Sequence, residues 1–290
     1  MRPAAPARRV FVLGAALAAA GLRGQAPPPQ LRIGLVPYLS TRAMVGLYQP
    51  LRRHLEAELG APVTLFTAAD FRALAENARS GEYALALLPA HFVRVAVEDW
   101  GHALVARAAS LSEVHLIARR DAVPELPGGL RGQRIAVIDP LSLTVLALRR
   151  WLSERGLVPG RDVTIEPVRS AGSAVIAVQR GEAVAMVGAI GQMRDFGIGA
   201  GADLVHIATL ETIPTPAFVA HPSVPPDQVA QWRRALLGFV PPAGLEGGLS
   251  GQRFVAAELR DFDRVTPYLA ETRRLLAQPR PAPARATKTP

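Results

Sequence analysis

The sequence predicts an α/β protein of two lobes, in which helices cover mainly parallel sheets. Two observations support this prediction. Short runs that are apolar throughout alternate with stretches of helical periodicity, which is typical of parallel strands buried on both faces. The alternation is interrupted once, by the stretch RDAVPELPGGLRGQ, and then starts again. A chain of 290 residues is long enough for one or two domains.

The first alternating set begins at Leu31 with the buried strand LRIGLVPY. A helix is predicted over residues 48–59, where leucines recur every four residues until Gly60 stops the pattern. The strand PVTLF follows, and Asp70 is expected to cap the next helix. The set is completed by the strand YALALL, a helix that opens at Pro89, and the strands ALVARAA and EVHLIAR.

The second set begins with the strand RIAVID. Its further elements are a helix over 144–155, the strand DVTIEPV, a helix over 174–180, and the strands AVAMVGAI and LVHIATL. The last part of the chain holds the strand TPAFVAHP and helices over 226–239, 254–259 and 266–276.

These two sets suggest that the first lobe is resumed after the second. Crossings between the lobes are expected near Ala118 and Thr209. The first lobe would then comprise residues 31–118 and 210–276, and the second lobe residues 119–209.

Both ends of the chain differ in composition from its body. Residues 1–26 are interpreted as a signal peptide, because arginines precede an apolar run and small residues before Pro27 fit a cleavage site. A membrane anchor is the alternative, but the run over residues 10–22 is shorter than the ~20 residues that span a bilayer. The stretch ARRVFVL also resembles a twin-arginine signal. The Pro- and Ala-rich residues 277–290 are expected to be disordered.

Charge and residue types exclude several classes of function. The formal net charge is +9, but the two ends carry seven of these charges and no acid, which leaves the body near +2 (9 − 7). Nucleic acid binding therefore loses its main support. The absence of cysteine excludes disulfides and thiol chemistry. No two of the six histidines have the spacing of metal ligands, so no metal is expected. The sequence contains no recognisable pair of nucleophile and base, so no enzymatic activity and no cofactor are expected.

The stretch VIDPLSLTVLAL contains the strongest candidate for a binding site. Two hydroxyls, Ser142 and Thr144, follow Asp139-Pro140 at the point where an apolar run ends and a helical pattern begins. Hydroxyls and unpaired amides at a helix N-terminus can bind an anion. Ser142 can equally be an N-cap that only stabilises the helix. The residues alone leave both interpretations open.

Three long stretches resemble one known family, the periplasmic substrate-binding proteins of ABC importers for phosphate, phosphite and phosphonate. They are RIGLVPYLSTRAMVGLYQPLRRHLEAELGAPVTLFTAADFRALAENARSGEYALALLPAHF, then LPGGLRGQRIAVIDPLSLT, and then ATLETIPTPAFVAHPSVPPDQVAQWRRALLGF. The resemblance covers roughly residues 31–276. It implies a type II periplasmic binding protein fold with a hinged cleft between the lobes, which close on one ligand.

The resemblance also implies which residues bind the ligand. The family's Asp-Pro-x-Ser-Thr-Ser run lies on residues 139–144, so Ser142 and Thr144 keep two hydroxyls and Leu143 replaces the middle one. An aromatic residue of the family falls on Phe71, which lacks the hydroxyl and could equally be a core residue.

Other positions of the family are altered in this sequence. A second aromatic falls near Ser112, a carboxylate falls on Thr215, and another carboxylate falls near Gly191. The family's histidine falls near Ser173, which could instead cap a helix, and Tyr38 is either at the cleft mouth or packed elsewhere. The implied ligand-binding residues are Tyr38, Phe71, Ser112, Ser142, Thr144, Ser173 and Thr215.

The expected function is that of the periplasmic solute-binding component of an ABC importer, a monomer that binds a small anion between its lobes and presents its closed form to a permease. The lost carboxylates argue against an aminoalkyl-phosphonate, since they suit a cationic amine. The lost histidine and Leu143 favour a smaller or less polar anion, or a ligand with an apolar part that faces Leu143 and Phe71. The alternative is a periplasmic sensor that presents its closed form to a receptor kinase, and no nucleic acid partner is expected.

Overall fold

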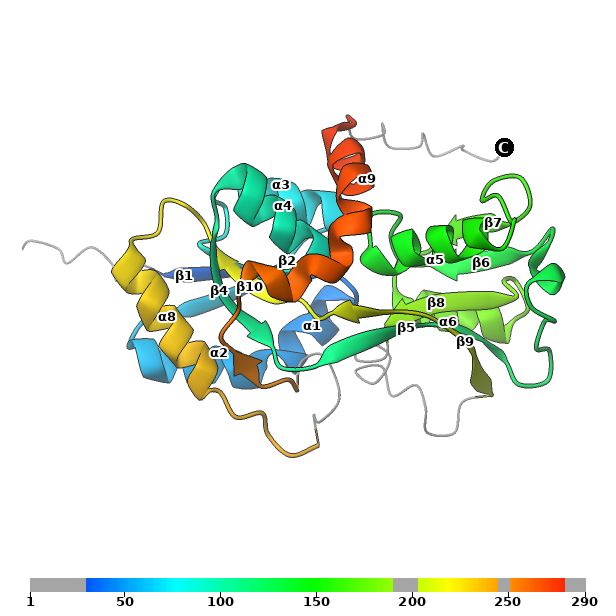
Figure 1. The fold of residues 1–290 in the computed structure, drawn as a ribbon. Helices are drawn as coiled ribbons and strands as arrows, with labels where there is room; N and C mark the ends of the chain where they lie inside the picture. Colours follow the sequence, from blue (N-terminus) through cyan, green and yellow to red (C-terminus); the bar gives the residue numbers. More distant parts are fainter. Residues whose placement is uncertain (1–29, 190–202, 245–250, 280–290) are drawn as a thin grey trace, which may run out of the picture.

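The computed structural model describes residues 30–189, 203–244 and 251–279, so the predicted signal peptide and most of the predicted disordered tail lie outside the described residues. Two β-sheets lie side by side, each with helices packed on it (Figure 1). The predicted two-lobed α/β class is confirmed. No helix in the described part of the chain has both the length and the apolar character needed to cross a membrane.

The first sheet has the strand order β11-β4-β10-β3-β1-β2. Its strands are β1 (Leu31–Leu35), β2 (Val63–Thr67), β3 (Leu85–Leu88), β4 (Ala103–Ala108), β10 (Ala217–Ala220) and β11 (Phe254–Val255). The helices of this lobe are α1 (Thr41–Leu47), α2 (Gln49–Leu59), α3 (Phe71–Arg79), α4 (Ala90–Trp100), α8 (Pro226–Gly238), the 3-10 helix η2 (Leu259–Val265) and α9 (Thr266–Ala277).

The second sheet has the strand order β7-β6-β8-β5-β9. Its strands are β5 (Leu111–Arg119), β6 (Arg134–Val137), β7 (Thr164–Pro167), β8 (Ala185–Ala189) and β9 (Leu204–Pro214). The helices of this lobe are η1 (Gly128–Leu130), α5 (Leu143–Glu154) and α6 (Ala171–Gln179).

Both sheets are mixed, whereas we expected them to be mainly parallel. In the first sheet β10 is antiparallel to both of its neighbours, β3 and β4, and β11 is antiparallel to β4. In the second sheet β5 is antiparallel to β8 and β9. A strand that is buried on both faces is apolar throughout whatever its direction, so the apolar runs could not reveal these reversals.

We expected the chain to cross between the lobes near Ala118 and Thr209. In the structure it leaves the first sheet before Ala118 and returns to that sheet after Thr209. Strand β5 pairs with β9 from Leu111 to Arg119, so both strands belong wholly to the second sheet. The chain therefore passes between the sheets over residues 109–110 and returns over residues 215–216. That the two lobes move as separate bodies with the predicted boundaries stays a prediction.

Three other elements differ from the sequence-based expectations. Helix α1 precedes α2 and was not predicted, because its single buried side chain, Met44, gives no periodic signal. Residues 254–259 were expected to be helical, but β11 pairs there with β4 and is followed by η2, so that helix prediction is wrong. Helix α6 begins at Ala171, because Ser170 rather than Ser173 is its N-cap.

Local signals do determine where the helices at the lobe interface begin. The Asp70 side chain accepts a hydrogen bond from Ala73 N at 2.7 Å and caps α3, as predicted. Ser142 caps α5, with its Oγ accepting from Val145 N at 3.4 Å. A side-chain acceptor at an N-cap satisfies one of the amides that the first helical turn leaves unpaired. As a result α3 and α5 both begin at the boundary between the two sheets.

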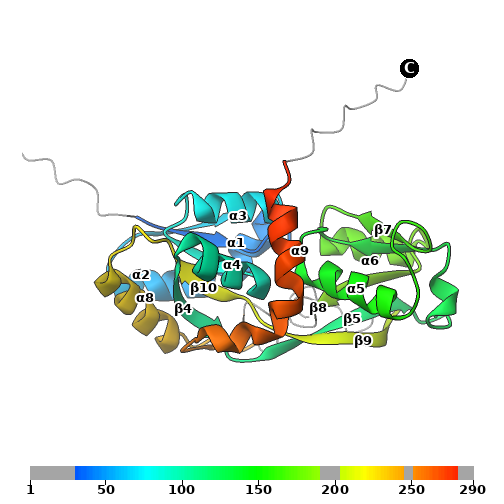
Figure 2. The same ribbon diagram turned by 45° about the horizontal axis from the view of Figure 1, so that its top comes forward.

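Helix α9 joins the two lobes on one side of the molecule. It lies between α4 of the first lobe and α5 of the second (Figures 1 and 2). The Tyr268 hydroxyl donates to Glu211 on β9, and the Arg150 guanidinium lies 6.0 Å from the Tyr268 ring centroid. At the other end of α9, the Arg72 guanidinium donates to the carbonyl of Leu275 at 2.6 Å, where a cation suits the helix dipole.

Candidate functional site

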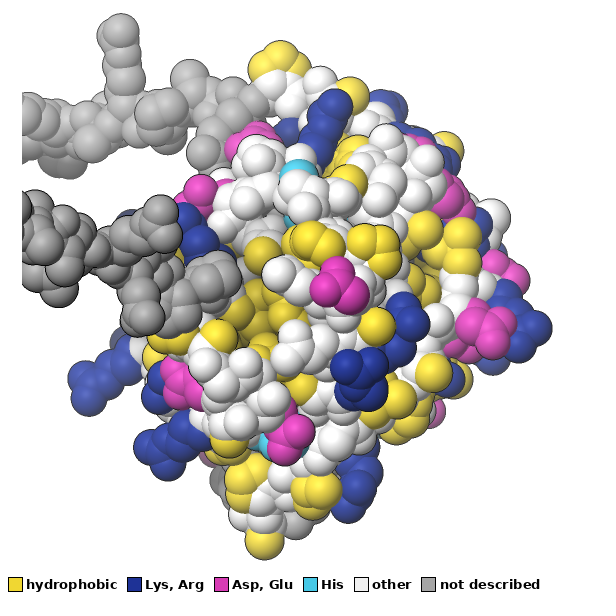
Figure 3. All heavy atoms as spheres, turned by 90° about the vertical axis from the view of Figure 1, so that its left-hand side faces the viewer, with side chains coloured by type: hydrophobic (Ala, Val, Ile, Leu, Met, Phe, Trp, Pro, Cys, Tyr) yellow, Lys and Arg dark blue, Asp and Glu magenta, His cyan; other side chains and the backbone are white. Residues whose placement is uncertain are grey.

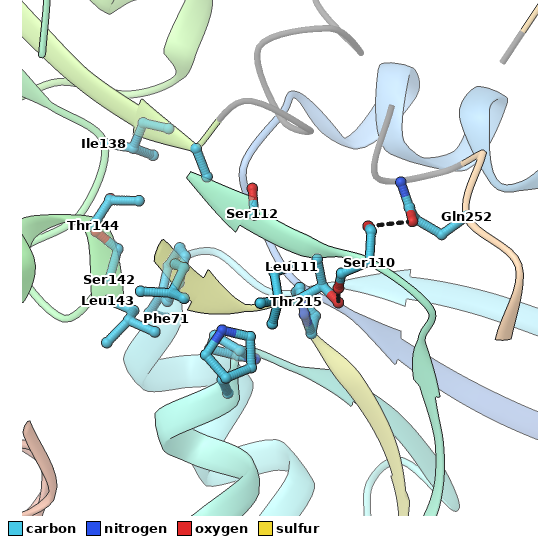
Figure 4. Close-up of a pocket in the computed structure, with 16 residues that line it drawn as sticks. Phe71, Ser110, Leu111, Ser112, Ile138, Ser142, Leu143, Thr144, Thr215 and Gln252 are labelled. Atoms are coloured by element: carbon cyan, nitrogen blue, oxygen red, sulfur yellow. Dashed lines mark hydrogen bonds between the residues drawn. The ribbon is translucent and has the colours of Figure 1, made fainter. Parts of the chain in front are cut away.

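A small pocket lies between the two sheets, where the N-terminal ends of α3, α4 and α5 meet the ends of β5, β8 and β9 (Figure 4). Its volume is about 70 Å³. Apolar side chains such as Phe71, Leu111, Ile138, Leu143 and Ile213 form much of its wall. The polar side chains that line it are Ser110, Ser112, Ser142, Thr144, Thr215 and Gln252. None of the described lining residues carries a charge, so this wall offers neutral donors and apolar surface.

Ser142 and Thr144 line the pocket and also belong to the start of α5. Their hydroxyl oxygens lie 3.0 Å apart and are hydrogen bonded to each other, and both side chains are buried. The amides of Leu143 and Thr144 lie in the first turn, where a helix has no internal acceptors for them. The capping role of Ser142 is confirmed, and its hydroxyl is close enough to the pocket to have a second role there.

Ser112 lines the same pocket from the other side, on β5 (Figure 4). Its side chain is 6% exposed, and its hydroxyl has no hydrogen-bond partner among the described residues. A buried hydroxyl without a partner costs about 1–3 kcal/mol, so such groups are rare unless a ligand, ion or water satisfies them. The Ser112 hydroxyl is therefore a group that a ligand or a water molecule in this pocket could satisfy.

Thr215 also lines the pocket, but its hydroxyl has a partner within the protein. Its Oγ1 donates to the carbonyl of Ser110 at 2.8 Å. The Ser110 hydroxyl in turn donates to the Gln252 side-chain oxygen at 2.6 Å (Figure 4). Sequence reasoning missed Ser110 and Gln252, because the residues that meet here are 142 positions apart and belong to no recognisable motif.

Asp139 connects the two lobes beside the pocket. Its carboxylate accepts hydrogen bonds from Phe71 N at 3.0 Å and from Leu141 N at 2.7 Å. Phe71 opens α3 of the first lobe, and Asp139 follows β6 of the second. Burial raises the pKa of Asp139, and the two amide hydrogen bonds oppose that rise. Asp139 was noticed only as the start of a binding run, because nothing local pairs it with Phe71.

His91 makes a second connection between the lobes. The ring nitrogen Nε2 lies 2.9 Å from the carbonyl oxygen of Leu141 and must donate to it, because a carbonyl only accepts. The ring is fully buried, and burial lowers the pKa of His91 to about 4. The other ring nitrogen, Nδ1, has no partner in the described structure, so a second proton there would be unsatisfied. The imidazole is therefore neutral near pH 7.

The structure places two implied ligand-binding residues away from the pocket lining. Tyr38 is fully buried in the core, which agrees with the packed alternative for this residue. Ser173 lies in the first turn of α6, where its hydroxyl and that of the N-cap Ser170 are 3.1 Å apart. The other five, Phe71, Ser112, Ser142, Thr144 and Thr215, all line the pocket. The expected carboxylate position near Gly191 lies outside the described residues.

Other classes of site find little support in the described residues. No group of three potential metal ligands occurs among them. His115 and His206 do face each other, with ring centroids 4.1 Å apart, and burial is the main cause that lowers the pKa of His115. Basic and acidic side chains are interspersed on the face shown in Figure 3, where no large basic patch for nucleic acid is visible.

Comparison with known proteins connects this geometry to a family. Residues 33–262 match the family model described as ABC transporter, phosphonate, periplasmic substrate-binding protein. No curated protein matches the sequence.

Solved structures show the same fold at low sequence identity. A binding protein component of an ABC phosphonate transporter from Pseudomonas aeruginosa is 15% identical, with a TM-score of 0.74 over 85% of this chain and 87% of that one. A Prochlorococcus marinus protein in complex with methylphosphonate is 13% identical, with a TM-score of 0.68 over 85% and 98%. The alkanesulfonate-binding protein of Xanthomonas axonopodis pv. citri, bound to MOPS, is 16% identical, with a TM-score of 0.55 over 87% and 96%.

Proposed function

The chain belongs to the periplasmic substrate-binding proteins of phosphonate ABC transporters, and from this premise we propose that its pocket binds a small tetrahedral anion with a short apolar part. Proteins of this family bind small anions in the periplasm and work with an ABC permease. We also propose that the protein is exported through a cleavable signal in residues 1–26, and that it is a monomer with a single binding site.

The observation that supports this proposal most is the hydroxyl of Ser112, which has no partner among the described residues and faces the same pocket as Ser142 and Thr144. Hydroxyls and first-turn amides are donors that suit the oxygens of a phosphonate or sulfonate head. Phe71 and Leu143 offer apolar surface for a methyl or short alkyl group. A solved relative of similar fold holds methylphosphonate, and another holds a sulfonate buffer.

We propose that the ligand stabilises a closed arrangement of the two lobes. Ser112 lies on β5, whose sheet also carries α5, while Phe71 comes from the first lobe. Contacts that exist only when Phe71 faces Ser142 and Thr144 would shift the population toward the closed form. A permease that binds the closed form better would then receive loaded protein.

A sensor role is the second candidate. The observation that favours it is the altered site, in which Leu143 and Thr215 stand where the family has a hydroxyl and a carboxylate. A receptor kinase would then recognise the closed form instead of a permease. Permease and ATPase genes beside the gene for this protein would support transport, and a kinase gene would support sensing.

A thermal-shift screen tests the proposed ligand class. Methylphosphonate, phosphite or methanesulfonate at about 100 times its Kd should stabilise the protein by about 2.7 kcal/mol. For a chain of this size that corresponds to a rise in Tm of roughly 5–10 °C. 2-Aminoethylphosphonate should raise the Tm less, because the described lining residues offer no carboxylate to its ammonium group. If no small phosphonate, phosphite or sulfonate changes the Tm, the proposed ligand class is wrong.

Two single substitutions separate binding from helix capping. Ser142→Ala should cost about 1 kcal/mol of stability, because it removes the N-cap acceptor of α5. Thr144→Val keeps the shape of the side chain, and it should weaken ligand binding roughly tenfold with little change in stability beyond its hydrogen bond to Ser142. Calorimetric titration and chemical denaturation of each variant provide the two readouts. Wild-type affinity in Thr144→Val, together with only a lower Tm in Ser142→Ala, would show that both hydroxyls are structural.

A further inference from the structure

We propose that Asp139 is a specificity-determining residue, which makes the pocket prefer singly charged tetrahedral anions over doubly charged ones. This inference rests on the function proposed above, since it concerns the charge of the ligand in the same pocket. Asp139 does not line the pocket itself. Its carboxylate acts through its charge and through the amide donors that it occupies at the edge of the pocket.

The carboxylate of Asp139 already holds two amides that border the pocket. It accepts from Phe71 N at 3.0 Å and from Leu141 N at 2.7 Å. Phe71 lines the pocket, and Leu141 is followed directly by the lining residues Ser142 and Leu143. The negative charge of Asp139 therefore lies next to the pocket wall. One of the two amides that it binds belongs to a lining residue, and the other belongs to the neighbour of one.

The groups packed around Asp139 leave its charge without an ion pair among the described residues. Burial is the main cause that raises the pKa of Asp139, and nearby Asp70 adds repulsion. Arg72 is the cation that acts on it, but its guanidinium donates to the carbonyls of Leu275, Leu276 and Gln278 at the end of α9. His91 on α4 is neutral near pH 7, because its pKa is lowered to about 4. Two amide hydrogen bonds are thus the partners that stabilise the ionised carboxylate.

The charge balance of the pocket suits one negative charge on the ligand. Three helices begin at the pocket, with Phe71, Ala90 and Leu143 as their first residues. Each N-terminus carries about +0.5 of an elementary charge, so together they contribute roughly +1.5. The carboxylate of Asp139 reduces this sum to roughly +0.5, and the polar side chains described in the lining are hydroxyls and one amide. The attraction to this residual charge grows in proportion to the charge of the ligand, whereas the cost of removing the ligand from water grows with the square of that charge. The pocket therefore compensates a second negative charge poorly.

Ser112 is an independent observation that points to a ligand among these helix N-termini. Its hydroxyl is buried, lines the pocket and lacks a partner among the described residues. A hydroxyl can donate one hydrogen bond and accept others, so it suits an oxygen of a singly charged head without supplying any positive charge. The site consequently has donors for an anion but no described cationic side chain that would compensate a second charge.

The test compares two ligands of the same shape and different charge. Methanesulfonate is a monoanion, and methylphosphonate is a dianion at a pH above its second ionisation. We expect calorimetric titration at one such pH to give the wild-type protein a Kd for methanesulfonate at least about tenfold lower than for methylphosphonate. In Asp139→Asn this ratio should fall toward one or reverse. Glu154→Gln, which removes an exposed acid at the far end of α5, should keep the wild-type ratio.

The ratio of the two Kd values separates charge selectivity from a loss of lobe contact, because weaker closure in Asp139→Asn affects both ligands alike. If that variant does not fold, the wild-type protein still tests the inference. Its affinity for methylphosphonate should fall about tenfold as the pH rises through the second ionisation of the ligand, while that for methanesulfonate stays unchanged.

The outcomes distinguish this inference from the proposed function. Binding of both ligands with equal affinity, or an unchanged ratio in a folded Asp139→Asn variant, would overturn the selectivity and leave the proposed function intact. Binding of neither ligand, nor of phosphite, would overturn the proposed function and this inference with it.

Discussion

A Ser112→Ala, Thr144→Val double variant is expected to bind its anion at least about a hundredfold more weakly than the wild-type protein while remaining folded. Each hydroxyl that donates to a charged ligand contributes roughly 1.5–3 kcal/mol, so two of them contribute about 3–6 kcal/mol. At about 1.4 kcal/mol for each factor of ten, this corresponds to a loss of about 10²–10⁴ in affinity. The two hydroxyls lie on opposite sides of one pocket, so each can donate to a different oxygen of the same ligand.

Removal of the Ser112 hydroxyl should weaken ligand binding without lowering the stability of the protein. The Ser112 hydroxyl is buried and unpartnered in the described structure, so its removal is expected to be neutral or slightly stabilising. A double variant outside the pocket, Thr209→Val with Ser223→Ala, serves as the matched control, because it removes the same two chemical groups. Calorimetric titration measures binding, and chemical denaturation measures stability. A wild-type Kd in the pocket double variant would show that these hydroxyls do not contact the ligand.

Acidification from pH 6.5 toward pH 4 is expected to destabilise the protein by up to about 3 kcal/mol through His91 alone. The pKa of His91 is lowered from 6.5 to about 4 in the folded state, so between these values the unfolded chain binds more protons. Stability therefore falls as the pH falls through this window. Burial lowers the pKa values of His102 and His115 too, which adds to the effect with the same sign. Asp139 acts in the opposite direction, because its pKa is raised.

His91→Gln provides the comparison for the pH effect. Glutamine can still donate to the carbonyl of Leu141, but it does not titrate. Urea denaturation at several pH values should show a shallower loss of stability on acidification in this variant than in the wild-type protein. His54→Gln, which changes a histidine of α2 that does not act on His91, His102 or His115, should keep the wild-type slope. Equal slopes in wild type and His91→Gln would mean that His91 is not the group that destabilises the protein at low pH.

The sequence by itself determined most of the elements and their order, because the signals involved are local. Asp70 and Ser142 were recognised as residues that precede helices, and both do cap them. Gly60 was expected to stop a helix, and it adopts the left-handed conformation that suits glycine at a C-cap. A capping residue lies within a few residues of the amides or carbonyls that it affects, at the start or the end of a helix. One short stretch of sequence therefore contains the whole interaction.

Only the tertiary structure decided how these elements form a site. Phe71 and Asp139 are 68 positions apart, and His91 and Leu141 are 50 apart, yet both pairs connect the lobes. The insertion of β10 between β3 and β4, and the pairing of β11 with β4, likewise depend on distant partners. The sequence identified Ser142 and Thr144 because they follow a strand and open a helix. The hydroxyl of Ser112, which lacks a partner within the described part of the chain, and the charge of Asp139 acquire their meaning from long-range packing, which leaves no periodic or local signal in the sequence.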